Sequence, residues 1–100
     1  MTRYYLEKKG SILKFWTNNR DLYNRVFDYI NDVVDGSLYN QPLEIVNATV
    51  DMNNQIIRFE TENIALLYRV EEHLKLCAAA VAYRNRVEKG PIPSNLDTLL

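Results

Sequence analysis

Two segments of the chain match each other without gaps when they are offset by 44 positions, and this internal match constrains the fold more than any other feature. Residues 11–26 align with residues 55–70. The identical pairs are Ile12/Ile56, Phe15/Phe59, Thr17/Thr61, Asn19/Asn63, Leu22/Leu66, Arg25/Arg69 and Val26/Val70. The match predicts one structural unit used twice. Convergence remains the alternative, because any two strand–helix units share a period and a cap.

The local patterns predict the same strand–helix order in both segments. Residues 12–17 and 56–61 are rich in β-branched and aromatic side chains, which favour strands. Each segment ends in a Thr-x-Asn step of helix-capping residue types, and Asn18 with Asp21 has a spacing close to a capping box. Apolar residues then recur at helical spacing, as Leu22, Val26, Ile30 and Val33 and as Leu66, Val70, Leu74, Cys77 and Val81. Gly36 is expected to cap the first helix, and Gly90 with Pro91 to end the second.

A further strand precedes each of these strands, so the chain predicts a duplicated ββα–ββα arrangement. Residues 4–8 lead into a turn at Lys9 and Gly10, and residues 43–51 lead into a turn at residues 52–55. We predict a single α+β domain over residues 1–100, with a four-stranded antiparallel sheet and both helices on one of its faces. Its internal units are residues 2–36 and 43–90, joined by a loop at residues 37–42, and residues 91–100 form a C-terminal tail.

Side-chain alternation assigns the strand residues to two faces of the predicted sheet. Leu13, Phe15, Ile57 and Phe59 are expected to face the helices. The opposite face then mixes charged, polar and apolar residues: Arg3, Tyr5, Glu7, Ile12, Lys14, Trp16, Asn47, Thr49, Asp51, Ile56, Arg58 and Glu60. Trp, Tyr and Arg are enriched where binding energy concentrates. We therefore predict a binding surface on this open face, made of Arg3, Tyr5, Lys14, Trp16 and Arg58. The alternative is a solvated face with scattered apolar residues.

The second predicted helix carries an apolar line beyond the stripe that its core needs. Leu76, Ala80, Tyr83 and Val87 follow each other at spacings of four, three and four, roughly 100° around the helix from the core stripe. The small Ala80 suits the close approach of a second helix. We therefore expect this line to be the interface of a homodimer or of a contact with another protein. The alternative is that residues 92–100 fold over it.

Composition argues against nucleic-acid and membrane partners. The formal net charge is -1, so no overall attraction to phosphate is expected. The longest apolar run, residues 76–83, is too short to cross a bilayer. Cys77 is the only cysteine, which excludes an internal disulfide, and the first residues lack a signal-peptide pattern. We expect a cytoplasmic protein.

The residue types indicate no cofactor, no metal and no catalytic site. His73 and Cys77 lie four residues apart on the predicted helix, a spacing compatible with a thiolate–imidazole pair or half of a metal site. A structural metal site needs four ligands, however, and the sequence holds no second Cys/His cluster. Because Cys77 lies on the core stripe, we expect it to act as an inert small hydrophobe.

These observations favour a small protein-interaction or regulatory module, of adaptor or inhibitor type, that acts by docking and forms a homodimer. The alternative is a nucleic-acid-binding domain that uses the open sheet face, with Tyr5 and Trp16 stacking on bases. Glu7, Asp51 and Glu60 share that face and would repel phosphate. A minor alternative is an enzyme whose site lies at a dimer interface around His73.

Overall fold

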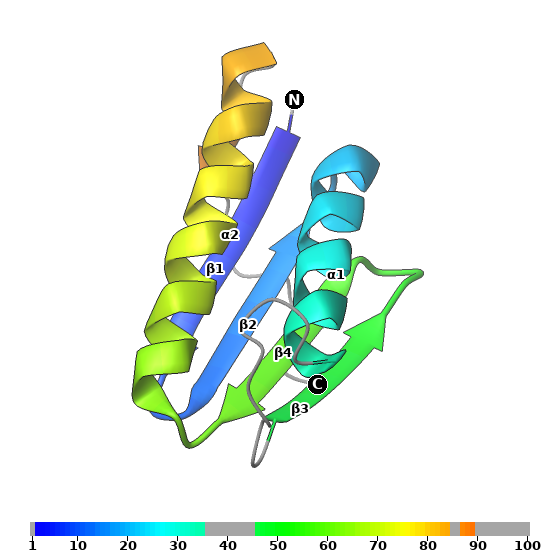
Figure 1. The fold of residues 1–100 in the computed structure, drawn as a ribbon. Coiled ribbons are helices and arrows are strands. Elements are labelled where there is room, and N and C mark those ends of the chain that lie inside the picture. Colours follow the sequence, from blue (N-terminus) through cyan, green and yellow to red (C-terminus); the bar gives the residue numbers. More distant parts are fainter. Residues whose placement is uncertain (1, 36–45, 85–86, 90–100) are drawn as a thin grey trace.

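The computed structural model describes residues 2–35, 46–84 and 87–89, and these form an α+β fold with both helices on one face of a sheet (Figure 1). In chain order the elements are β1 (Thr2–Lys9), β2 (Ile12–Thr17), α1 (Arg20–Asp35), β3 (Val46–Asp51), β4 (Ile56–Thr61), α2 (Ile64–Arg84) and β5 (Val87–Lys89). The α+β class, the antiparallel run of four strands and the two helices are confirmed. Neither helix of the described part is long and apolar enough to cross a membrane.

Within the described residues the sheet has five strands in the order β3-β4-β2-β1-β5, one more than predicted. The first four are antiparallel neighbours, and β5 pairs in parallel with the outer edge of β1, where Arg3 lies opposite Glu88. The predicted end of the second helix was therefore wrong, because α2 stops at Arg84 instead of continuing to Gly90. Residues 87–89 pair with the outer edge of β1. The backbone hydrogen bonds of this pairing favour a strand at these residues over a further turn of helix.

Two hairpins build the antiparallel part, and each turns at a residue with positive φ. In the first hairpin Lys9 pairs with Ile12, and Gly10 has φ 61°, a left-handed conformation that glycine adopts without a steric cost. In the second, Gln55 has φ 58°, and the Asp51 carboxylate accepts hydrogen bonds from the backbone and side chain of Asn54. Those bonds to the charged form lower the pKa of Asp51.

The strand-to-helix junctions repeat the same hydrogen bonds in both halves. Asn19 Oδ1 accepts from the Leu22 N–H at 3.0 Å, and Asn63 Oδ1 accepts from the Leu66 N–H at 3.1 Å. Thr17 Oγ1 and Thr61 Oγ1 accept from the N–H of Asn19 and Asn63, both at 3.1 Å. The N-caps are thus the Asn residues of the Thr-x-Asn steps. The expected capping role of Asn18 was wrong, because its side chain accepts from the Arg3 N–H instead.

The core lies between the helices and the inner face of the sheet. The four strand residues expected to face the helices are each 1% exposed, namely Leu13, Phe15, Ile57 and Phe59. Both predicted helical stripes are buried in the same cluster, except that Cys77 is only partly buried. Leu67 and Ala78 complete the buried side of α2, and Tyr23 and Tyr29 complete the buried side of α1.

Several predicted features lie outside the described residues. They are the cap at Gly36, the loop at residues 37–42, the first three residues of the strand expected at 43–51, and the tail at residues 91–100.

Candidate functional site

The sheet face that points away from the helices, called the far face below, carries the residues that the sequence assigned to it. The strand register places them in rows across the sheet, because residues opposite each other in a ladder share a face. One row runs Glu7–Lys14–Arg58–Thr49 and the next Tyr5–Trp16–Ile56–Asp51. A third row runs Lys9–Ile12–Glu60–Asn47. Four of the five predicted binding residues on this face retain exposed or partly exposed side chains: Arg3, Lys14, Trp16 and Arg58.

Tyr5, the fifth, is not available for binding. Its side chain is 7% exposed and packs in a second small cluster with Ile56, which is fully buried, and with the partly buried Trp16. The Tyr5 hydroxyl donates a hydrogen bond to the Glu7 carboxylate. Cross-strand packing within this row therefore removes Tyr5 from solvent, an outcome that side-chain alternation alone does not reveal.

The charges at the centre of the far face largely neutralise one another. Lys14 lies directly opposite Arg58 on one side and opposite Glu7 on the other. The Arg58 guanidinium forms an ion pair with Glu60 at 3.5 Å, and both side chains are partly exposed. Each of the two central cations thus has a carboxylate on a neighbouring position. The face is a mixed-charge surface rather than a basic groove.

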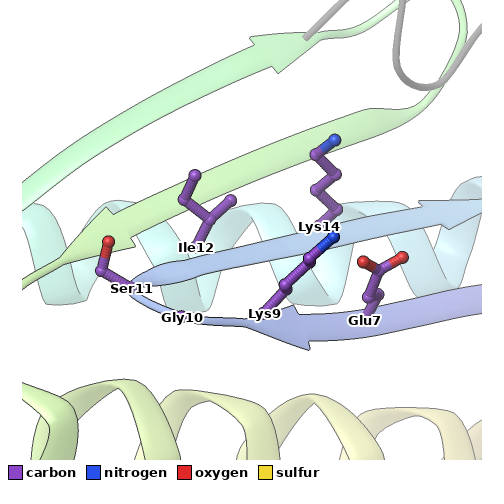
Figure 2. Close-up of a pocket in the computed structure, with 6 residues that line it drawn as sticks. All are labelled: Glu7, Lys9, Gly10, Ser11, Ile12 and Lys14. Atoms are coloured by element: carbon purple, nitrogen blue, oxygen red, sulfur yellow. The ribbon is translucent and has the colours of Figure 1, made fainter.

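A depression of about 360 Å³ opens on the far face at the β1–β2 hairpin. It is lined by Glu7, Lys9, Gly10, Ser11, Ile12 and Lys14. Figure 2 shows the side chains of Lys9 and Glu7 on β1 beside those of Ile12 and Lys14 on β2. Two ammonium groups, one carboxylate and one hydroxyl suit a polar or anionic group on a partner's surface. The depression lies at the sheet surface, beside the turn of the β1–β2 hairpin.

The outward side of α2 is the second candidate surface. Leu76 is 66% exposed and Ala80 is also exposed, so these two members of the predicted apolar line face solvent. Tyr83 lies in the last turns of α2, but its side chain is outside the described residues. Val87 lies in β5, so the predicted line along one continuous helix was wrong at its last position. The helix ends three residues earlier, where backbone pairing with β1 begins.

Two further exposed apolar side chains on α2 were not predicted from the sequence. Ile64 is 56% and Tyr68 is 55% exposed, one turn apart at the start of the helix. A helical wheel centred on Val70 and Leu74 places Ile64 about 100° and Tyr68 about 140° away from the core direction, so the signal was present in the spacing. We call the set Ile64, Tyr68, Leu76, Ala79 and Ala80 the α2 outer surface.

His73 and Cys77 belong to the packing between the helices. The His73 ring stacks on the Tyr29 ring of α1, with centroids 3.7 Å apart and planes at 13°. Burial lowers the pKa of His73 and raises the pKa of the Cys77 thiol, an effect that the nearby Arg25 partly offsets. No group of three or more His, Cys, Asp or Glu side chains within the described ranges could hold a metal ion.

Comparison with known protein families, curated proteins and solved structures finds no match to this chain. The chain's own geometry is therefore the basis for the proposals that follow.

Proposed function

We propose that this protein is a protein-interaction module that acts by docking, and that the α2 outer surface contacts its protein partner. The observation that carries the proposal is the exposure of Ile64, Tyr68 and Leu76, each more than half accessible to solvent on one helix. The opposite side of that helix already supplies the core. Burying such side chains gains about 25 cal/mol for each Å² of apolar surface removed from water.

Polar groups around these side chains fit the anatomy of a protein interface. The Lys8 ammonium lies 5.5 Å from the centre of the Tyr68 ring. Glu72 and Lys75, between Tyr68 and Leu76 in the chain, form an exposed ion pair at 3.4 Å. Interfaces combine apolar anchors with a polar rim in this way, and Tyr is among the residue types that carry most binding energy. The small Ala79 and Ala80 leave room for a partner's side chains.

We infer also that the two halves are one ββα unit used twice. Three observations support the inference: the same Thr–Asn capping bonds, the equal burial of Phe15 and Phe59, and the β-β-α-β-β-α order. The halves differ in their hairpin turns and in helix length, since α1 has 16 residues and α2 has 21. The longer α2 supplies the outer surface that α1 lacks, so the docking function is assigned to the second unit.

The test of docking uses a photo-crosslinking amino acid in place of Tyr68, in the full chain and in the native host. A captured protein is then purified and its affinity is measured by calorimetry for wild type, Leu76→Glu and Ala80→Glu. We expect each variant to weaken binding by about tenfold or more. Asn24→Glu adds the same charge at an exposed position of α1 and is the matched control. Equal affinity of all four proteins, or the absence of any captured protein, would overturn the proposal.

Nucleic-acid binding through the far face remains the second candidate. Lys9, Lys14 and Arg58 on neighbouring strands, with the partly exposed Trp16, are the observation in its favour. The burial of Tyr5 removes one of its two stacking platforms, and Glu7 and Glu60 lie among the cations. Such a mixture opposes the phosphate contacts that supply most non-specific affinity.

A further inference from the structure

The two edges of the sheet differ in how they are protected against pairing with another strand. At one edge β5 is only three residues long and carries Glu88 and Lys89. At the other edge β3 has six residues, all paired in unbroken register with β4. Natural edge strands are usually blunted by lysine, proline, bulges or short length. The β3 sequence Val-Asn-Ala-Thr-Val-Asp has none of these features, and residues 47–50 are all exposed.

The hydrogen bonds of the neighbouring ladder show which backbone groups of β3 point outward. The Thr17 N–H donates to the Gln55 carbonyl and the Thr61 N–H donates to the Ser11 carbonyl, so odd-numbered residues of β4 face β2. Alternate residues of a strand direct their N–H and C=O to opposite neighbours. Even-numbered residues of β4 therefore face β3, where their partners are odd-numbered. Within the described part of the chain, the N–H and C=O groups of β3 that β4 does not use belong to Val46, Ala48 and Val50.

These three outward residues form a self-complementary pattern about Ala48. If two β3 strands pair antiparallel with a two-fold axis at Ala48, the residue numbers of opposed positions sum to 96. Ala48 then meets Ala48 of the second copy, and Val46 meets Val50 of the second copy, each as a hydrogen-bonded pair. On the far face Asn47 meets Thr49 of the second copy. All of these cross-strand pairs are uncharged, apolar on the helix side and polar on the far side.

Charge does not oppose this pairing. Asp51, the only charged residue of β3, lies at its end, three residues from the axis. At about 3.3 Å per residue the two Asp51 residues of a pair would stand roughly 20 Å apart, beyond the screening length at physiological salt.

The helix layer adds apolar surface beside the same edge. Phe27 and Val34 fall along one line of α1 with the fully buried Tyr23, whose ring stacks on the Phe27 ring at 6.1 Å. Asp51 acts electrostatically on Tyr23, which places this line on the β3 side of α1. Val34 is 38% and Val50 is 39% exposed, and Phe27 is partly buried. An axis perpendicular to the sheet at Ala48 would bring these side chains toward their counterparts.

We propose that a second copy of this chain binds at β3, in antiparallel register about Ala48, to form a homodimer with a sheet continuous through both copies. This proposal concerns a surface separate from the α2 outer surface and does not depend on it. The dimer expected from the sequence is thereby assigned to a strand edge instead of the helix line. Both helices lie on one face of the sheet (Figure 1). Because the proposed axis is perpendicular to the sheet, the α2 outer surfaces of the two copies lie on the same side of the dimer, available to one bivalent partner.

The first test is the mass of the full chain in solution, measured by sedimentation over a wide concentration range. Wild type should sediment as a dimer. Ala48→Pro removes one outward N–H that β4 does not use, and Val50→Lys places a charge in the seam. Each should raise the dimer dissociation constant by about tenfold or more. Ile64→Lys introduces the same charge on α2 and should leave the dimer intact. A monomeric wild type, or a dimer unchanged by both edge variants, overturns the proposal.

The second test fixes the register without depending on stability. With Cys77 replaced by Ser, Ala48→Cys should form an intermolecular disulfide on mild oxidation, because opposed residues at the axis have Cα atoms about 5.5 Å apart. Val50→Cys should not crosslink to itself, since the axis separates its two copies by four residues along the strands. Crosslinking of Ala80→Cys in place of Ala48→Cys would assign the dimer to α2 and overturn the edge proposal.

Discussion

Lys14 on β2 lies directly opposite Arg58 on β4, and these two residues are 44 positions apart, the same offset that aligns the two halves of the sequence. The neighbouring pairs exchange the aligned positions, because Leu13 faces Phe59 and Phe15 faces Ile57, whereas the offset of 44 aligns Leu13 with Ile57 and Phe15 with Phe59. The register is thus symmetric about the Lys14–Arg58 pair. This register brings two cations together at the centre of the sheet, and Glu7 and Glu60 lie beside them.

This central pair predicts weak binding to nucleic acid. The carboxylates of Glu7 and Glu60 compensate the charges of this pair and repel phosphate. We expect no sub-micromolar affinity for single- or double-stranded oligonucleotides at about 150 mM salt. Fluorescence anisotropy measures this directly, with Lys14→Glu as the control for any residual binding. Tight binding that falls steeply with salt and is lost in Lys14→Glu would make the far face the functional surface.

The repeated caps predict similar losses of stability in the two halves. Replacing Asn63 by Ala removes one capping bond and should lower the free energy of unfolding by about 1 kcal/mol. Asn19→Ala should cost more, because the Asn19 side chain also donates to the Thr2 hydroxyl at 2.8 Å. Urea denaturation measures both. Asn31→Ala, on the exposed side of α1, should stay within about 0.5 kcal/mol of wild type. Equal values for all three variants would contradict the capping roles.

The hydroxyl of Tyr23 predicts a stabilising substitution. Its side chain is fully buried, and the hydroxyl has no hydrogen-bond partner within the described part of the chain. Burial raises its pKa, Arg20 lowers it and Asp51 raises it. Tyr23→Phe should increase the free energy of unfolding by about 1 kcal/mol, since a buried unpaired polar group costs about 1–3 kcal/mol. The ring stacking with Phe27 is retained. Tyr68→Phe, at an exposed site, is the control, and a destabilised Tyr23→Phe would show that the hydroxyl is satisfied.

The periodicity of apolar residues in the sequence predicted most of the fold. Phe15 and Phe59 were assigned to the helix side by alternation alone, and the Thr-x-Asn steps located both helix starts within one residue. The end of α2 was not predicted, because Val87 suits either a helix or a strand. Its pairing with the edge of β1 makes it part of a strand. Such pairing between distant segments leaves no local signal. The core stripe did end at the charged residues Arg84 and Glu88, which was the available warning.

The candidate surfaces were harder to predict for the same reason. Tyr5 was assigned to the correct face, yet its burial depends on packing with Ile56 and Trp16 from two other strands. Leu76 and Ala80 are exposed as expected, because the direction of their side chains depends only on the geometry of the helix. The open edge at β3 depends on strand order, which places β4 and β2 at the centre of the sheet. Local features of single elements were thus accessible from sequence, and relations between elements were not.

The stack of His73 on Tyr29 predicts a loss of stability at acidic pH. Burial lowers the pKa of His73 in the folded protein, while in the unfolded chain it titrates near pH 6.5. The unfolded chain therefore binds the proton first as pH falls. The contribution of the neutral imidazole is fully present above about pH 6.5 and is lost as pH falls through the lower, folded pKa.

The measurement compares wild type with His73→Phe, which retains a flat ring against Tyr29 but cannot titrate. Carboxylates elsewhere titrate in both proteins, so their contributions cancel in the difference between the two free energies of unfolding. This difference should be constant between pH 7.5 and 8.5, and should move in favour of His73→Phe between pH 6.5 and 5. Burial between α1 and α2 favours the neutral form of the His73 ring over the protonated form. A difference independent of pH down to pH 5 would mean that His73 is as well solvated in the folded protein as in the unfolded chain.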